Sequence, residues 1–181
     1  MISIVINFFL ILILGIIQVS FLSTWPWPVS SLNLILSLII FYAVINGYEK
    51  SLWLAFGSGL FLEVYSGLYF GVTVLSLMLT VIIINVLFNN FFTNRSYYSL
   101  MILGIIGTAA YNLIILVLCF FLNFIKLSPI SITPDFWAQF FWQSIFNLII
   151  LTIIFYAYHI STNRLRSFFL IPAYYENKNG R

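Results

Sequence analysis

Long apolar runs alternate with short polar breaks along the whole chain. A membrane-spanning helix needs about 20 mostly apolar residues, because the hydrocarbon core is about 30 Å thick and each helical residue rises about 1.5 Å. Six runs are candidates for such helices, and they cover residues 2–22, 32–47, 52–66, 72–88, 100–124 and 136–158. The pattern predicts an all-α integral membrane protein, a bundle of about six transmembrane helices.

The breaks between the runs contain residues that end helices. Two prolines in Trp25-Pro26-Trp27-Pro28 stop the first helix, and the two tryptophans suit a membrane interface. The third run meets Ser66-Gly67 early, so we expect residues 66–71 to be irregular backbone that is packed within the protein, away from lipid. Tight packing would then explain why Gly67 and Gly71 are glycines.

The first run lacks the features of a cleaved secretory signal. No Lys or Arg precedes it and no small-x-small cleavage site follows it, so we expect it to be retained as a helix. The chain contains no repeat and no low-complexity linker. Residues 1–160 are therefore expected to form one six-helix transmembrane domain, followed by a short basic cytoplasmic tail over residues 161–181.

Composition excludes an ordinary soluble domain. Of the 181 residues, 63% are hydrophobic and 6% are charged, which leaves too few polar residues to cover a soluble core. The net charge is +3, but the Lys and Arg residues lie between or after the apolar runs. We therefore expect the lipid bilayer, and no nucleic acid, as a partner. The single cysteine, Cys119, lies inside an apolar run and supports neither a disulfide framework nor a cysteine metal site.

The positions of the basic residues predict the orientation, because Lys and Arg are retained preferentially on the cytoplasmic side of short loops. With a cytoplasmic N-terminus and six crossings, Lys126 is the one basic residue outside. The cytoplasmic residues are then Lys50, Arg95, Arg164, Arg166, Lys178 and Arg181. This distribution favours a multi-pass protein with both termini in the cytoplasm.

Glu63 is the only Asp, Glu, Lys or Arg deep inside an apolar run. Carboxyl groups at such depth usually face the protein interior, so Glu63 is either a substrate, proton or partner site or a buried anchor between helices. Candidate hydrogen-bond donors to it are Gln18 and Asn33. Small residues recur at four-residue intervals on the same helix face, at Ala55, Gly59 and Gly67. Another helix can approach such a face closely.

A second polar stripe occupies the fifth run, where Gly104, Thr108 and Asn112 are spaced four residues apart. Asn147 lies at a comparable depth in the sixth run. A hydrogen bond between these two helices is therefore expected, worth about 0.6 to 2 kcal/mol. We interpret the stripe as helix packing.

Residues that could support enzymatic chemistry are scarce. His159 lies at the end of the sixth run without a second His or Cys spaced for metal binding. Asp135 follows Thr133-Pro134 at the start of the same run, where a carboxylate favours a helix N-terminus. No glycine-rich phosphate loop or nucleophile elbow occurs in the sequence. We expect no catalytic activity and no cofactor.

The order of these features resembles the MreD family, small multi-helix membrane proteins of the bacterial rod-shape system. The resemblance rests on Gln18, Trp25 to Pro28, Asn33-Leu34, the segment 57–71 with its glycines, acid and Ser-Gly pair, Pro134 to Trp137, and Asn147. Two positions depart from the family. Glu63 stands where the family usually has Asp, and Leu32 where it often has Pro.

The resemblance implies a non-enzymatic scaffold of the elongation complex, which acts with MreC and other membrane proteins of that complex to organise lateral peptidoglycan synthesis in the bacterial cytoplasmic membrane. It also implies a fold similar to the substrate-binding components of energy-coupling-factor vitamin importers, and such a component is the alternative function. A vitamin binder should have a polar and aromatic pocket near its outer face and an Ala-x-x-x-Ala pattern on its first helix, but residues 2–22 contain no alanine. An ion or lipid transporter is a third reading, based on Glu63.

The basic residues give a test of orientation. In a Cys119→Ser background, cysteines introduced at Ser30 and Ser128 should react with a membrane-impermeant maleimide in intact cells, because both lie in loops expected outside. A cysteine at Ser167 should react only after the cells are permeabilised. Labelling of Ser167→Cys in intact cells would reverse the orientation.

Overall fold

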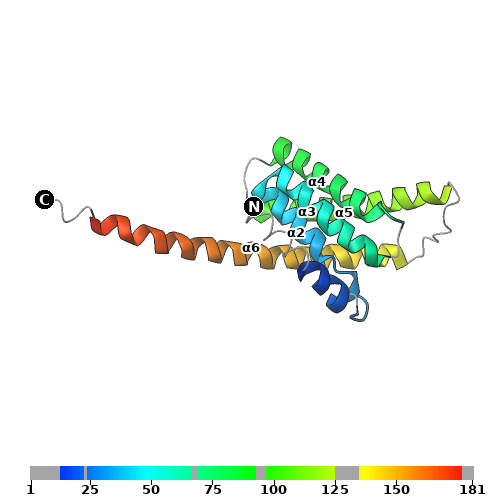
Figure 1. Ribbon diagram of the computed structural model, residues 1–181, viewed down its shortest axis with the longest axis horizontal. Helices are drawn as coiled ribbons and strands as arrows, with labels where there is room; N and C mark the ends of the chain where they lie inside the picture. Colours follow the sequence, from blue (N-terminus) through cyan, green and yellow to red (C-terminus); the bar gives the residue numbers. More distant parts are fainter. Residues whose placement is uncertain (1–12, 23, 67–68, 93–96, 125–134, 177–181) are drawn as a thin grey trace.

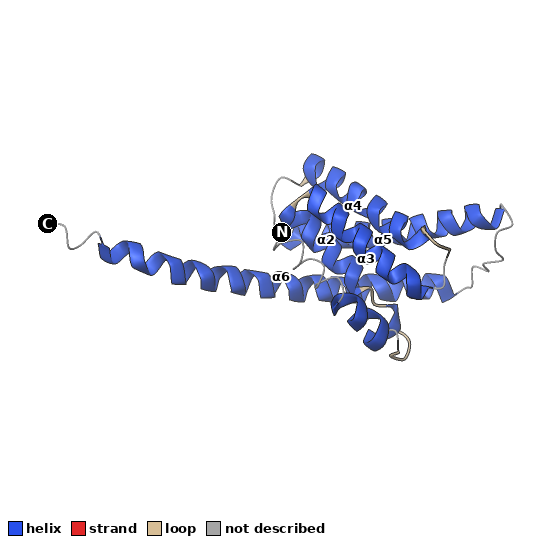
Figure 2. Ribbon diagram, in the orientation of Figure 1, coloured by secondary structure: helices blue, strands red, loops and turns tan. Residues whose placement is uncertain are grey.

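The computed structural model describes residues 13–22, 24–66, 69–92, 97–124 and 135–176, and their side chains from 13 to 160 except Asp135. This part of the chain is helical, with short turns between helices (Figure 2). An apolar helix, Ile13–Leu22, ends in a π-helical segment, η1 (Ile17–Leu22), and is followed by the short 3-10 helix η2 (Val29–Ser31). The α-helices are α2 (Leu34–Asn46), α3 (Tyr48–Ser66), α4 (Val72–Phe91), α5 (Tyr97–Phe124) and α6 (Asp135–Glu176).

Three of the described helices are long and apolar enough to cross a membrane: Val72–Phe91, Tyr97–Phe124 and Phe136–Ile160 within α6. The prediction of an all-α membrane bundle is confirmed at this level. Helix α2 has 13 residues, or about 20 Å at 1.5 Å per residue, which is less than the hydrocarbon thickness of about 30 Å. Six full crossings therefore stay a prediction, and residues 2–12 of the first run lie outside the described part.

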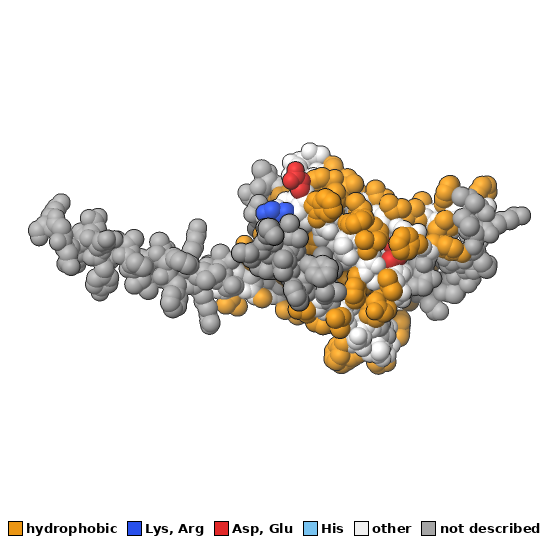
Figure 3. All heavy atoms as spheres, in the orientation of Figure 1, with side chains coloured by type: hydrophobic (Ala, Val, Ile, Leu, Met, Phe, Trp, Pro, Cys, Tyr) orange, Lys and Arg blue, Asp and Glu red, His pale blue; other side chains and the backbone are white. Residues whose placement is uncertain are grey.

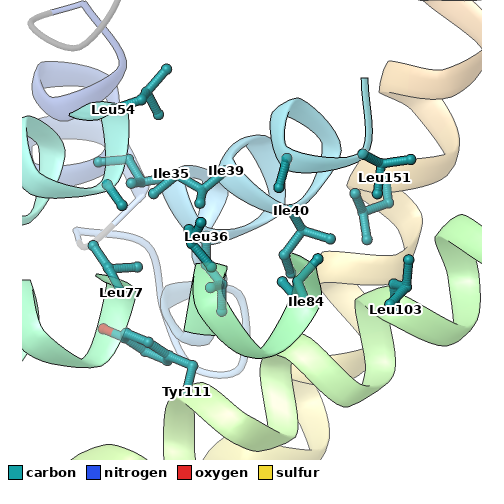
Figure 4. Close-up of a cluster of buried hydrophobic side chains, with 14 of the residues drawn as sticks. Ile35, Leu36, Ile39, Ile40, Leu54, Leu77, Ile84, Leu103, Tyr111 and Leu151 are labelled. Carbon is teal, nitrogen blue, oxygen red and sulfur yellow. The ribbon is translucent and has the colours of Figure 1, made fainter. Parts of the chain in front are cut away.

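Helix α2 forms the centre of the bundle, since it packs against α3, α4, α5 and α6 (Figure 1). Its side chains are buried on most sides, as expected for a helix that is apolar all round. Ile35, Leu36, Ile39 and Ile40 meet Leu77 and Ile84 of α4, Leu103 and Tyr111 of α5, and Leu151 of α6 in one buried cluster (Figure 4). Leu54 and Ala55 of α3 belong to the same cluster, so α3, α4, α5 and α6 all contribute to a core built around the 13-residue α2.

The outer surface of the bundle is apolar. Large side chains on the outward faces are widely exposed, among them Trp53 at 75%, Val117 at 61% and Ile153 at 61%. Hydrophobic side chains cover most of the visible face of the described bundle (Figure 3). Such a contiguous apolar surface is rare on soluble monomers. It is what helices in contact with lipid tails present.

The start of α3 and the end of α6 differ from the prediction, because polar residues in the sequence do not mark where these helices begin or end. Helix α3 begins at Tyr48, directly after Gly47, so Tyr48-Glu49-Lys50 is its first turn and not a loop. Gly47 has a positive φ of 87°, which glycine adopts readily, and this single residue separates the end of α2 from the start of α3. Glu49 in this first turn suits the positive end of the helix dipole.

The sixth helix was expected to end at Tyr158, but α6 continues to Glu176 and projects away from the bundle as a single helix (Figure 1). The prediction was wrong because it took the polar residues after Ile160 as the end of the helix. Residues 161–163 are Ser, Thr and Asn, none of which breaks a helix as Gly or Pro does. The polar segment marks the end of the apolar stretch only. Arg95, Lys126, Lys178 and Arg181 lie outside the described residues.

Candidate functional site

Helix α2 begins within the bundle, at the half-buried residues Asn33 and Leu34. The backbone N–H of Asn33, its N-cap residue, donates to Oδ1 of Asn147 at 3.2 Å. Asn147 lies about 18 Å along α6 from Asp135, at 1.5 Å per residue. The first N–H groups of α2 have no intrahelical partner, and they lie at half-buried residues within the bundle. Each such group would cost about 1–3 kcal/mol if it were left unpaired away from water.

Side chains from two other helices satisfy the start of α2. The Leu34 N–H donates to Oε1 of Gln18 at 2.8 Å, and the Gln18 amide donates to the Leu32 carbonyl at 2.8 Å. The Asn33 side chain caps its own helix by accepting from the Leu36 N–H at 3.0 Å. Together with Asn147, these side chains fix the start of α2 against the first helix and α6.

The first backbone N–H groups of α4 also need acceptors from outside their own helix, and the Glu63 side chain provides two of them. The Glu63 carboxyl, 5% exposed, accepts from the Thr73 N–H at 3.2 Å and from the Val74 N–H at 3.1 Å, with one oxygen for each. The Val72 N–H donates to the Tyr69 carbonyl at 3.1 Å. The orphan donors at the start of α4 are thereby paired. Both carboxyl oxygens are used in joining α3 to α4.

The predicted small-residue face of α3 packs against α4. Ala55, Gly59 and Glu63 are buried, and a Cβ on Gly59 would come within 2.9 Å of the Val74 Cα. The close-approach prediction is confirmed for these residues, whereas Gly67 lies outside the described part. Gly59 thus lets the α4 backbone come near enough for Glu63 to reach its N–H groups.

Gly71 corrects the tight-packing prediction. A Cβ there would meet no atom within 4 Å, and the neighbouring Phe70 is 83% exposed. The reason for glycine is the backbone, since Gly71 has a φ of 99° at the N-cap of α4. This left-handed conformation is unfavourable for residues that carry a Cβ.

The polar stripe of α5 makes the expected bonds to α6. Asn147, fully buried, donates to the Thr108 hydroxyl at 3.2 Å. Asn112 donates to Oε1 of Gln143 at 2.9 Å and to the Thr108 carbonyl at 2.9 Å. Because Asn147 also accepts from Asn33, one hydrogen-bonded chain links α2, α6 and α5.

Tyr111 and a pocket complete this region. Tyr111, 6% exposed, is hydrogen-bonded to the Asn33 side chain. A pocket of about 220 Å³ lies beside these groups. Its lining residues come from the first helix, α3, α4, α5 and the start of α2: Gln18, Val19, Asn33, Leu62, Tyr65, Ser66, Thr73 and Tyr111.

The structure brings most of the residues singled out from the sequence into one region, but with different partners. Gln18 and Asn33 were expected to donate to Glu63, and they bond to the backbone around α2 and to Asn147 and Tyr111 instead. Sequence reasoning missed Gln143 and Tyr111. A signal for Gln143 exists in its position one helical turn before Asn147, on the same helix face.

The described residues of this region include no candidate set of metal ligands. Within the residues that the structure describes, no group of three or more His, Cys, Asp or Glu side chains could hold a metal ion. The arrangement instead supplies hydrogen-bond donors and acceptors from amides, hydroxyls and one carboxyl. Its evident capacity is to hold helices together and to line a polar pocket.

Comparison with protein-family models, with curated proteins and with solved structures finds no match to this chain.

Valine substitutions of Gly59 and of Gly71 should destabilise the protein for different reasons. Gly71→Asn should be tolerated, because Asn adopts the left-handed region, whereas Gly71→Val should destabilise the protein. Gly59→Val should also destabilise it, through contact with Val74. Thermal unfolding of the purified variants in detergent measures this. Equal midpoints for Gly71→Val and Gly71→Asn would disprove the φ argument.

Substitution of Glu63 should lower stability in steps. Glu63→Gln keeps one acceptor oxygen and turns its amide towards the second N–H, which should cost about 1–3 kcal/mol. Glu63→Leu removes both acceptors and should cost more. The matched control, Glu49→Gln, removes an exposed acid from the same helix and should change the free energy of unfolding by at most about 1 kcal/mol. Wild-type stability in Glu63→Leu would show that the cap is not needed.

Proposed function

We propose that this chain is a non-enzymatic membrane scaffold of the bacterial rod-shape (elongation) complex, similar to MreD. It acts with an MreC-like protein and other membrane proteins of that complex to organise lateral peptidoglycan synthesis. Its place is the bacterial cytoplasmic membrane, which it crosses several times with both termini in the cytoplasm.

The resemblance to the MreD family supplies the proposed identity of the complex. Of the residues in the resembling segments, Gln18, Asn33, Glu63, Gly71 and Asn147 fix the starts of α2 and α4. A resemblance located at these positions concerns the architecture of the bundle. It therefore fits a protein whose task is to hold a defined shape for partners.

One observation supports the scaffold reading over a proton or ion pathway. Both oxygens of Glu63 accept hydrogen bonds from backbone N–H groups of α4. A transporting carboxyl has to exchange its partner for a proton or a cation during each cycle. Releasing Glu63 would leave the Thr73 and Val74 N–H groups unpaired inside the bundle, so a fixed role is favoured.

Partner recovery tests the proposal directly. A tagged copy that replaces the native gene should co-purify an MreC-like protein after mild detergent extraction. Recovery of the ATPase motor of a vitamin importer, without the MreC-like protein, would instead establish the alternative function of an importer substrate-binding component.

Variants at Glu63 separate the function classes in cells. Glu63→Gln keeps one hydrogen bond to α4, so rod shape and partner recovery should be largely retained at the growth temperature. Glu63→Leu should impair both. A proton pathway needs an ionisable group, so Glu63→Gln would then fail as completely as Glu63→Leu although the protein accumulates. Loss of rod shape in an abundant Glu63→Gln variant that still binds its partner would refute the scaffold role.

A further inference from the structure

Helix α6 extends well beyond the part of it that can cross a membrane. The stretch that is long and apolar enough to do so ends at Ile160, whereas the helix ends at Glu176. Residues 161–176, the α6 extension, reach about 24 Å past Ile160 at 1.5 Å per residue. The α6 extension projects from the bundle as a single helix, away from the other described helices (Figure 1).

The α6 extension leaves the bundle at the end where α2 stops and α5 starts. The Tyr158 ring packs against Phe41 of α2, with ring centroids 5.6 Å apart. Tyr97, the first residue of α5, packs against Phe155 at 5.5 Å. Tyrosines are enriched where membrane helices meet water. The α6 extension therefore begins at a membrane surface, which the basic residues predict to be the cytoplasmic one.

The sequence of the α6 extension falls into two parts. Residues 161–167 are mostly polar and include Arg164 and Arg166. Residues 168–175 are two Phe, Leu, Ile, Pro, Ala and two Tyr. Eight consecutive residues make more than two helical turns, so this second part is apolar or aromatic on every face. A helix that is apolar all round is normally buried, and this one therefore needs a surface on which to bury it.

Charge and position favour a bilayer surface as the partner. Arg164 and Arg166 precede the apolar part, and the sequence adds Lys178 and Arg181 after it, against the single acid Glu176. The cytoplasmic leaflet carries anionic lipids, which attract basic segments next to a transmembrane helix. Residues 168–175 are about 12 Å long as a helix, too short for another crossing, and Phe and Tyr suit the interface.

A straight α6 carries the apolar part away from the bilayer, so binding requires a bend. Ser161, Thr162 and Asn163 lie where the apolar stretch ends. These residue types have low helix propensity, because their side chains compete for backbone hydrogen bonds. Water at the membrane surface can pair the backbone groups that a bend releases. A bend at these three residues would place the rest of the α6 extension along the surface.

We propose that residues 164–176 bind the surface of an anionic bilayer, the cytoplasmic leaflet of the membrane that the chain itself crosses. Arg164 and Arg166 attract the anionic headgroups, and residues 168–175 insert at the boundary between headgroups and acyl chains. The short connection to Ile160 keeps this segment at a high effective concentration next to the bilayer. This membrane contact is independent of the scaffold role, because it requires no other protein.

The bend can be measured in the full-length protein, in a Cys119→Ser background, as the distance between two spin labels. Labels on Ile153→Cys and Ala173→Cys stand about 30 Å apart on a straight helix, and a right-angle bend at Thr162 brings them to about 21 Å. The purified protein is placed in nanodiscs of phosphatidylcholine, with or without phosphatidylglycerol. The shorter distance should predominate with phosphatidylglycerol. The label at residue 173 should then be accessible to oxygen and shielded from a water-soluble nickel chelate.

Two pairs of variants separate charge from side-chain geometry. Arg164→Gln combined with Arg166→Gln should lower the ratio of bent to straight helix by roughly 25-fold in phosphatidylglycerol nanodiscs, since each basic residue near an anionic surface contributes about fivefold. The matched control, Arg164→Lys with Arg166→Lys, keeps both charges and should behave as wild type. Phe168→Ser with Phe169→Ser removes apolar contacts and should return the label at residue 173 to water.

Three results would overturn the proposal. The longer distance with a water-exposed label in both lipid compositions would refute binding to the bilayer. Equal bending with and without phosphatidylglycerol, unchanged in the glutamine variants, would refute recognition of anionic lipid. A label that becomes shielded only when another protein co-purifies with the chain would assign the α6 extension to a protein partner instead.

Discussion

Two helices of this protein begin within the bundle, α4 at buried residues and α2 at half-buried ones, and their first backbone N–H groups are bonded to side chains of other segments. An unpaired N–H in such surroundings costs about 1–3 kcal/mol, so each helix start needs acceptors from elsewhere in the chain. Gln18, Asn33 and Asn147 supply them to α2, and Glu63 supplies them to α4. The close approach at Gly59 and the central position of the short helix α2 both depend on this pairing, because the acceptors reach their donors only when the helices are packed in this way.

The same constraint connects architecture with function. The side chains most suggestive of chemistry in the sequence, a buried acid and several amides, are engaged in fixing helix starts and helix pairs. A carboxyl held by two backbone N–H groups is suited to rigidity and poorly suited to exchange of protons or ions. A pocket of about 220 Å³ lies beside this network, lined in part by Gln18, Asn33 and Tyr111.

The helical class and the positions of most helices follow from the sequence, because in lipid every backbone polar group must be paired within the helix and apolar runs of sufficient length therefore become helices. The helix starts at Val72 and Asp135 agree with the apolar pattern to within one residue. The boundaries at Tyr48 and Glu176 do not, because Gly47 alone ends α2 and the polar residues after Ile160 continue the helix. Hydropathy locates where a chain meets lipid, whereas backbone conformation decides where a helix ends.

For the candidate site, the sequence by itself determined which residues matter: a lone acid, a small-residue face around Gly59, and asparagines spaced to face one another on α5 and α6. Only the tertiary structure decided their partners. Glu63 bonds to the backbone of α4 and not to Gln18 or Asn33, and Gly71 is required for its φ of 99° and not for space. The physical reason is that a side-chain pattern records depth and helix face, which are one-dimensional properties. The depth at which α2 and α4 begin depends on how all the helices pack, and that depth selects the acceptor for each buried N–H.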